Sequence, residues 1–86
     1  MNENEQFRTS DINLASFLSA KGFQLFKIEN HSKRKIFVFD NNLQLKHLTE
    51  VFYFAQENDA ELMVDARKLF RSLKELKTKI YSIDYH

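Results

Sequence analysis

The side chains best suited to metal binding in this sequence are three histidines, His31, His47 and His86. None of them stands three or four residues from another histidine, and the chain contains no cysteine. A zinc site needs several ligands that converge on the ion at about 2 Å. The sequence therefore predicts neither a metal site nor a cofactor, and we interpret the histidines as exposed side chains.

The patterns typical of hydrolases and phosphate-binding enzymes are also missing. No serine stands in a glycine-flanked elbow, and the single glycine, Gly22, cannot form a phosphate loop. Asp11, Asp59 and Glu61 are possible catalytic carboxylates, but helix caps and solvated charges account for them better. We therefore expect a protein without enzymatic activity. A cleft in which His47 meets an acidic residue would favour the alternative, a small enzyme.

Charge is distributed unevenly along the chain, although the net charge at pH 7 is only +1. Residues 66–83 contain six lysines and arginines and one acid, Glu75, whereas residues 50–65 contain five acids and no lysine or arginine. Such a dipolar distribution suits a nucleic acid, an acidic protein partner or self-association through opposite patches.

The first third of the chain predicts a short strand and a helix. Residues 6–9 suit a strand, and Thr9 or Ser10 then offers an N-cap hydroxyl. An amphipathic pattern follows over residues 12–19. Gly22 lies just beyond it and is predicted to end the helix in the left-handed conformation.

A β-hairpin is predicted next. Residues 23–29 alternate as in a strand, which would place Phe26 and Ile28 together on one face. The polar stretch NHSKR follows as a turn, and residues 35–40 form the second strand.

This second strand contains the sequence IFVF, in which both faces are apolar. Phe37 and Phe39 share one face, and Ile36 and Val38 share the other. An RNA-binding sheet would instead keep one open face that carries aromatic rings. We therefore interpret the segment as a central strand, buried on both sides by helices or by another subunit, rather than as a base-stacking surface.

The second half of the chain predicts two more helices. Asn41 or Asn42 can cap a helix that runs from Leu43 to about Gln56. Further on, apolar residues recur at spacings of four and three, which is a heptad-like seam. The last helix begins either near Ala60, or, as we favour, at Asp65 after an extended segment. The seam consists of Leu62, Ala66, Leu69, Leu73, Leu76, Ile80 and Ile83.

Three stretches carry a family resemblance. The segments FRTSDINLASFLSAKGF, IFVFD and VDARKLFRSLKELKTKIY resemble a family of short domains of unknown function found in bacteria, their phages and other mobile elements. Members of that family often place a proline where Ala66 stands, which suits the first turn of a helix. The resemblance covers roughly residues 7–81 and implies a fold, but no catalytic residue.

One candidate contact surface is basic. If the apolar seam faces inward, Arg67, Arg71 and Lys74 lie on the opposite side of the last helix. This stripe is long enough to follow a nucleic-acid backbone, although a solvated helix face is the plainer explanation. The turn of the hairpin adds a basic loop of Lys33, Arg34 and Lys35.

The other candidate surface is apolar. Tyr53 and Phe54 lie off the main apolar face of their helix, and Tyr81 carries apolar character toward the end of the chain. These rings exceed what a small core needs, so a homo-oligomer that buries them is plausible. They could also wrap around the core of a monomer.

We expect a single domain over residues 1–86, with residues 1–5 as a tail. The fold class is α+β, a small antiparallel sheet built on a β-hairpin and packed with three helices, in the order β-α-β-β-α-(β)-α. The expected function is that of a small non-catalytic binding protein. It would be a phage or mobile-element accessory factor that binds a protein or a nucleic acid, with counter-defence as a narrower version.

The principal alternative is an oligomeric structural or assembly protein. No apolar stretch approaches the roughly 20 residues that span a bilayer, and the polar N-terminus is unlike a secretory signal. We therefore expect no membrane partner and a location in the cytoplasm of a bacterium or of an infected host.

Overall fold

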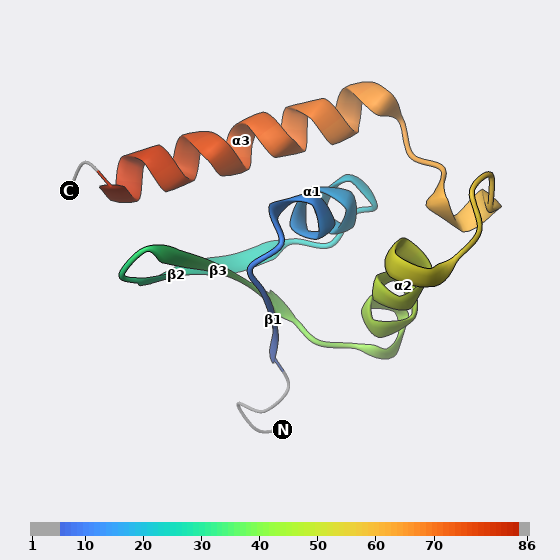
Figure 1. The fold of residues 1–86 in the computed structure, drawn as a ribbon, viewed down its shortest axis with the longest axis horizontal. Coiled ribbons are helices and arrows are strands. Elements are labelled where there is room, and N and C mark those ends of the chain that lie inside the picture. Colours follow the sequence, from blue (N-terminus) through green and yellow to red (C-terminus); the bar gives the residue numbers. More distant parts are fainter. Residues whose placement is uncertain (1–5, 85–86) are drawn as a thin grey trace.

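The structure is a computed structural model, of which residues 6–84 are described. It confirms the α+β fold, with a three-stranded antiparallel sheet and three α-helices (Figure 1). The predicted tail, residues 1–5, lies outside the described residues. The elements are β1 (Gln6–Thr9), α1 (Ile12–Ala20), β2 (Leu25–His31), β3 (Arg34–Asp40), α2 (Leu43–Phe54), the 3₁₀ turn η2 (Ala60–Leu62) and α3 (Ala66–Asp84).

The strand that contains IFVF is central, because the sheet has the order β1-β3-β2. Phe37 and Phe39 are buried against α1 and α2, which cover the inner face of the sheet. The predicted burial of both faces is correct at Val38, which is 0% exposed, but no helix of the described residues covers that face. Burial of that face by another subunit stays a prediction. This face, here called the outer sheet face, carries Val38 between Arg8 of β1 and Lys27 of β2.

A β-bulge corrects the predicted faces of the first hairpin strand. Leu25 pairs with Phe39 and Lys27 with Val38, so Phe26 is an extra residue without a partner in β3. Because of this extra residue, Leu25 and Ile28 both pack against the core. Phe26 is left 57% exposed at the β2 edge, where it lines a hollow with Ile28 and with the end of α3. Strict alternation of side chains could not predict this, since a bulge shifts the pattern by one residue.

Helix α1 is the central element of the core, and both of its ends are capped. Asp11, rather than the predicted Thr9 or Ser10, is the N-cap, and its Oδ1 accepts hydrogen bonds from the backbone of Asn13 and Leu14. Thr9 instead accepts a hydrogen bond from the Asp11 backbone through its hydroxyl. At the other end Gly22 has a φ of +109°, as the sequence predicted.

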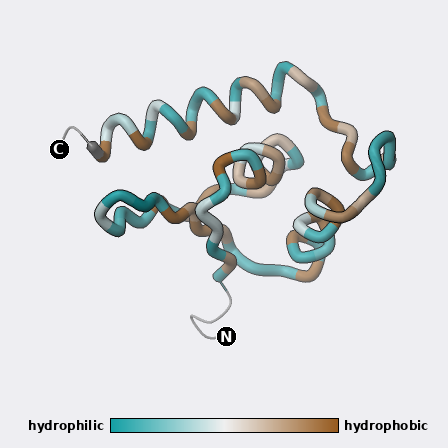
Figure 2. The backbone as a smooth tube through the Cα atoms, in the orientation of Figure 1, coloured by the Kyte–Doolittle hydropathy of each residue, from teal (hydrophilic) through white to brown (hydrophobic). Residues whose placement is uncertain are grey.

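The beginning of the last helix is at the favoured position. The Asp65 side chain accepts hydrogen bonds from the Arg67 and Lys68 backbone, so α3 begins directly after it. The optional strand before this helix is absent, and η2 occupies that part of the chain. In Figure 2, hydrophobic and hydrophilic residues alternate along α3 turn by turn, as expected for a helix that packs on one side only.

Replacement of Gly22 tests the end of α1. The positive φ is unfavourable for any residue with a Cβ, although an added Cβ would meet no atom within 4 Å. We therefore expect Gly22→Ala to lower the free energy of unfolding by about 1–2 kcal/mol through backbone strain alone. Urea unfolding measures the change. Gly22→Asn should cost less, since asparagine tolerates positive φ better, and equal stability of Gly22→Ala and the wild type would contradict this account.

Candidate functional site

A mainly apolar groove of about 430 Å³ lies between the helices. Its walls come from α1, the end of α2, the segment after η2, and the first half of α3. We call it the apolar groove. It is lined by Asn13, Ser16, Phe17, Phe52, Leu62, Val64, Leu69, Phe70 and Leu73.

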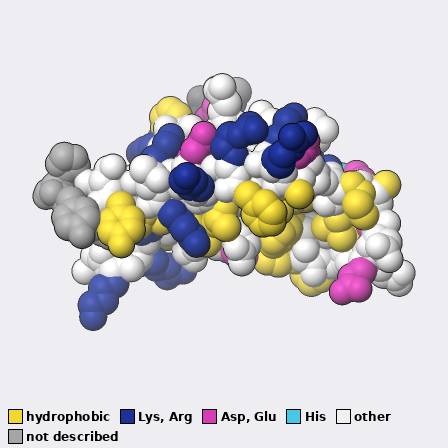
Figure 3. All heavy atoms as spheres, turned by 90° about the horizontal axis from the view of Figure 1, so that it is seen from above, with side chains coloured by type: hydrophobic (Ala, Val, Ile, Leu, Met, Phe, Trp, Pro, Cys, Tyr) yellow, Lys and Arg dark blue, Asp and Glu magenta, His cyan; other side chains and the backbone are white. Residues whose placement is uncertain are grey.

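Aromatic rings connect the floor of the apolar groove to the surface. Phe17 of α1 is buried, and its ring lies 5.2 Å from that of Phe52. The Tyr53 ring meets the Phe52 ring edge-on, with 5.2 Å between their centres. The centre of the Phe54 ring lies 6.4 Å from that of Tyr53. On the opposite wall Phe70 is 66% exposed. The space-filling view of the α3 side shows hydrophobic side chains gathered beside lysines and arginines (Figure 3).

Tyr53 is held in place by a polar contact as well as by its ring. Its hydroxyl donates a hydrogen bond of 2.7 Å to Asp11 Oδ2, while Asp11 Oδ1 caps α1. The bond to this carboxylate raises the pKa of the Tyr53 hydroxyl. Asp11 therefore fixes the end of α2 relative to the start of α1, and these two elements form one end of the apolar groove.

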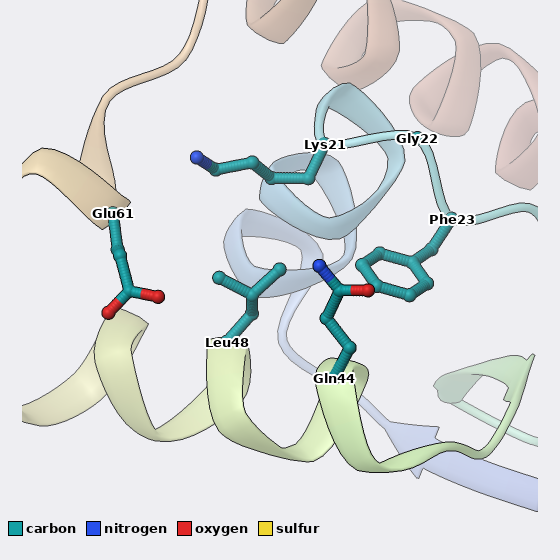
Figure 4. A pocket seen from close by; sticks show the side chains of 6 residues that line it. All are labelled: Lys21, Gly22, Phe23, Gln44, Leu48 and Glu61. Atoms are coloured by element: carbon teal, nitrogen blue, oxygen red, sulfur yellow. The ribbon is translucent and has the colours of Figure 1, made fainter.

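A second hollow, of about 370 Å³, is polar and lies between the end of α1, α2 and η2 (Figure 4). Lys21, Gln44 and Glu61 contribute its polar side chains. Glu61 Oε2 also lies 2.8 Å from His47 Nε2, and the two form a hydrogen bond. The residues that line this hollow include no hydroxyl or thiol that could serve as a nucleophile.

The contacts around this polar hollow hold η2 and the residues after it. Lys21 Nζ donates a hydrogen bond of 2.7 Å to the Met63 carbonyl and lies 5.6 Å from the centre of the Phe17 ring. Together with the His47–Glu61 contact, this bond fastens the segment to α1 and α2. Leu62 and Val64 belong to the same segment and line the apolar groove. The polar contacts therefore position a wall of the apolar groove.

The outer sheet face carries a network of charges around one carboxylate. Glu29 of β2 accepts hydrogen bonds from Arg8 Nη2 at 3.1 Å and from Arg8 Nε at 3.4 Å, across the intervening strand β3. Lys27 and His31 contact the same carboxylate at 3.4 and 3.1 Å. The hydrogen bonds from Arg8 and then from His31 lower the pKa of Glu29 to about 2.

The predicted basic residues fall on separate parts of the molecule. Arg67, Arg71 and Lys74 are exposed on α3, which packs against α1 over the inner face of the sheet. Arg34 lies at the start of β3 and lines a hollow on the outer sheet face. Lys33 is exposed in the hairpin turn and Lys35 is half-buried beside it. Arg34 and Arg71 therefore do not form one binding surface.

The predicted apolar contacts are divided in the same way. Tyr53 and Phe54 are 49% and 83% exposed at the end of α2, near the apolar groove. Tyr81 is 64% exposed but lies eleven residues beyond Phe70 on α3, or about 16 Å along the helix axis. Phe70 itself lies beside the apolar seam of α3. The heptad-like spacing therefore does not indicate it, although an aromatic residue next to the seam is visible in the sequence.

Comparison with known proteins identifies the family. A family model described as "Domain of unknown function (DUF5659)" matches residues 4–82, so the chain belongs to this family, in agreement with the resemblance to domains of unknown function. No curated protein and no solved structure matches the chain. Within residues 6–84 no helix is long and apolar enough to cross a membrane, and no group of three or more His, Cys, Asp or Glu side chains could hold a metal ion.

Acid titration tests the charge network. The pKa of Glu29 is about 2 in the folded chain against an ordinary value of 4.5. A lowered pKa contributes stability above pH 4.5, and this contribution is lost as the pH falls from 4.5 to 2. Glu29→Gln should therefore flatten the decline in unfolding free energy over this range, as followed by urea unfolding at several pH values. Glu57→Gln is the control, and a similar flattening there would contradict the assignment.

Hydrogen exchange tests the fastening of η2. His47→Ala removes the contact with Glu61, so we expect faster exchange of the Leu62 and Met63 amides, which bond to Asp59 and Ala60 within this turn. Mass spectrometry of the exchanged protein provides the measurement. His31→Ala changes a histidine far from this segment and should leave these amides unaffected. Unchanged protection in His47→Ala would show that the contact does not hold the turn.

Proposed function

We propose that this protein is a small non-catalytic binding protein that holds an amphipathic, acidic segment of a protein partner in the apolar groove. The observation that carries the proposal is Phe70, a ring that is 66% exposed on the wall of an apolar hollow of about 430 Å³. Hollows of this size and lining are typical of ligand sites, and grooves between helices commonly receive an apolar helix face.

The hydrophobic core does not explain this exposed ring. Leu76 is the only buried residue among the described side chains of α3, although apolar residues recur along the whole helix. Leu69 and Leu73 are half-buried where they line the apolar groove. A partner would bury these side chains together with Phe70. This burial stabilises the complex by roughly 25 cal/mol for each Å² of apolar surface removed from water.

The charges beside the apolar groove favour an acidic partner. Arg67 and Lys74 stand three and four residues from Phe70, so they flank its ring on the same side of α3. Residues 66–74 contain four lysines and arginines and no acid. Opposite charges at the rim of an interface favour the correct partner and speed its association. Asn13 adds a polar side chain on the α1 wall.

The same groove suits the role expected from the family resemblance. An accessory protein of a phage or mobile element acts on other macromolecules of its host, and occupation of a host protein's acidic helix or tail would need only binding. In this proposal the contacts around the polar hollow hold η2 in position, and the hollow has no catalytic role. The pair formed by His47 and Glu61 is exposed on both sides, with relative side-chain exposures of 55% and 51%.

Selection of peptides tests this proposal. A random peptide library displayed on phage is selected against the full chain, and the enriched peptides are measured by fluorescence anisotropy. We expect enriched sequences with apolar residues at helical spacing and with glutamate or aspartate around them. Phe70→Ser should weaken their binding about tenfold or more, since truncation of a central aromatic contact commonly costs more than about 1.4 kcal/mol.

Phe26→Ser provides the matched control, because Phe26 is similarly exposed but belongs to β2 and not to the apolar groove. Its affinity for the selected peptides should equal that of the wild type. Equal losses in both variants, or enrichment of basic peptides, would overturn the proposal. Light scattering separates another outcome: a dimer that Phe70→Ser dissociates would show that the occupant is a second copy of the chain.

A further inference from the structure

The outer sheet face has properties that the apolar groove does not explain. The described helices α1 and α3 lie together on the opposite side of the sheet (Figure 1). A hollow of about 530 Å³ lies on the outer sheet face, and two arginines are among the residues that line it. It is lined by Arg8, Thr9, Ser10, Glu29, His31, Arg34 and Ile36.

The cations on this face exceed the acids around the hollow. Arg8 and Lys27 share the single carboxylate of Glu29 with the His31 ring. Arg34 has no acidic partner among the described residues, and its Nη2 makes only a long hydrogen bond of 3.5 Å to Ser10 Oγ. The other acid in this register, Asp40, lies at the far end of β3, opposite Gln6. Positive charge therefore remains at the hollow.

The polar groups at the hollow are mostly hydrogen-bond donors. Two guanidinium groups, those of Arg8 and Arg34, lie on the neighbouring strands β1 and β3. The Thr9 hydroxyl does not add to them, because it is engaged with the Asp11 backbone and with Tyr53. Phosphate oxygens are acceptors with negative charge, and guanidinium groups bind them with two parallel hydrogen bonds.

An exposed ring lies at the edge of the same charged strand. Phe26 is displaced from the ladder by the β-bulge, is 57% exposed, and lies with its ring centre 5.8 Å from Lys27 Nζ. It stands at the β2 edge beside the outer sheet face, where it shares a hollow with Lys79 and Ile83 of α3. Proteins that bind single strands combine a positively charged surface with rings on which bases stack. The rings expected at the centre of the sheet, Phe37 and Phe39, are buried and cannot serve this purpose.

We propose that the outer sheet face binds single-stranded nucleic acid, with phosphates at Arg34, Arg8 and Lys27 and a base stacked on Phe26. Guanidinium groups also bind carboxylates, so an acidic protein is the alternative that the titration below separates. The ring of Phe26, with Lys27 and Lys79 beside it, favours a stacked base with phosphates on either side. The proposal is independent of the apolar groove, because the two surfaces share no residue.

Fluorescence anisotropy tests the proposal with labelled single strands of about 20 nucleotides, in DNA and RNA form, and with the corresponding duplex. Titrations at about 50 mM and about 200 mM salt should show a slope of roughly −2 in log K against log salt, as expected for three phosphate contacts to a single strand. Arg34→Glu should weaken binding about tenfold. Phe26→Leu should weaken the binding of single strands but not of heparin, which has no bases.

Arg71→Glu is the matched control, since it makes the same charge change at an exposed arginine on α3. Its affinity for the single strands should stay within about twofold of the wild type. Three results would overturn the proposal: no binding at the lower salt, equal losses in Arg34→Glu and Arg71→Glu, or tighter binding of the duplex than of the single strand. The nucleic-acid assignment would be overturned if polyglutamate bound as tightly as the single strands and Phe26→Leu left both affinities unchanged. These results are independent of the peptide experiment, because Phe70→Ser changes the apolar groove and not the outer sheet face.

Discussion

The rest of the structure depends on the burial of α1 on all sides. Leu14, Ala15, Ser16, Phe17 and Leu18 are consecutive and all buried, which covers more than a full turn of helix. Such a helix needs neighbours around its circumference, and it has the sheet, α2 and α3. The one polar side chain in this run is satisfied within the helix, because the Ser16 hydroxyl donates to the Ile12 carbonyl at 2.8 Å.

The apolar groove follows from this arrangement. Helices α2 and α3 both pack on α1, and the chain between them passes through η2 before α3 begins at Ala66. Two helices that pack on different sides of a third leave a space between them, which the lining side chains fill only in part. The residues around that space must be apolar for α1 to stay buried. The packing of the core and the formation of the apolar groove therefore have the same cause.

Features determined by neighbouring residues could be predicted from the sequence. The positive φ of Gly22, the start of α3 at Asp65 and the central place of the IFVF strand are of this kind. Features determined by strand order or by a bulge could not. Glu29 meets Arg8 only because β3 lies between β1 and β2, and one extra residue in β2 leaves Phe26 exposed at the edge of the sheet. The position of Phe70 on the groove wall depends on how α3 crosses α1, and the heptad-like seam does not specify this.

The charge network on the outer sheet face connects β1 and β2 across the intervening strand β3. The chain has enough apolar surface to cover one face of a small sheet, and charged side chains connect the strands across the other. Exposed ion pairs contribute little to the free energy of folding. The stability of the fold therefore does not require several cations around one carboxylate. The structure nevertheless groups several cations around Glu29 and leaves Arg34 without an acid among residues 6–84. An anionic ligand bound at this face, as we propose, accounts for a cation that no acid of the described residues neutralises.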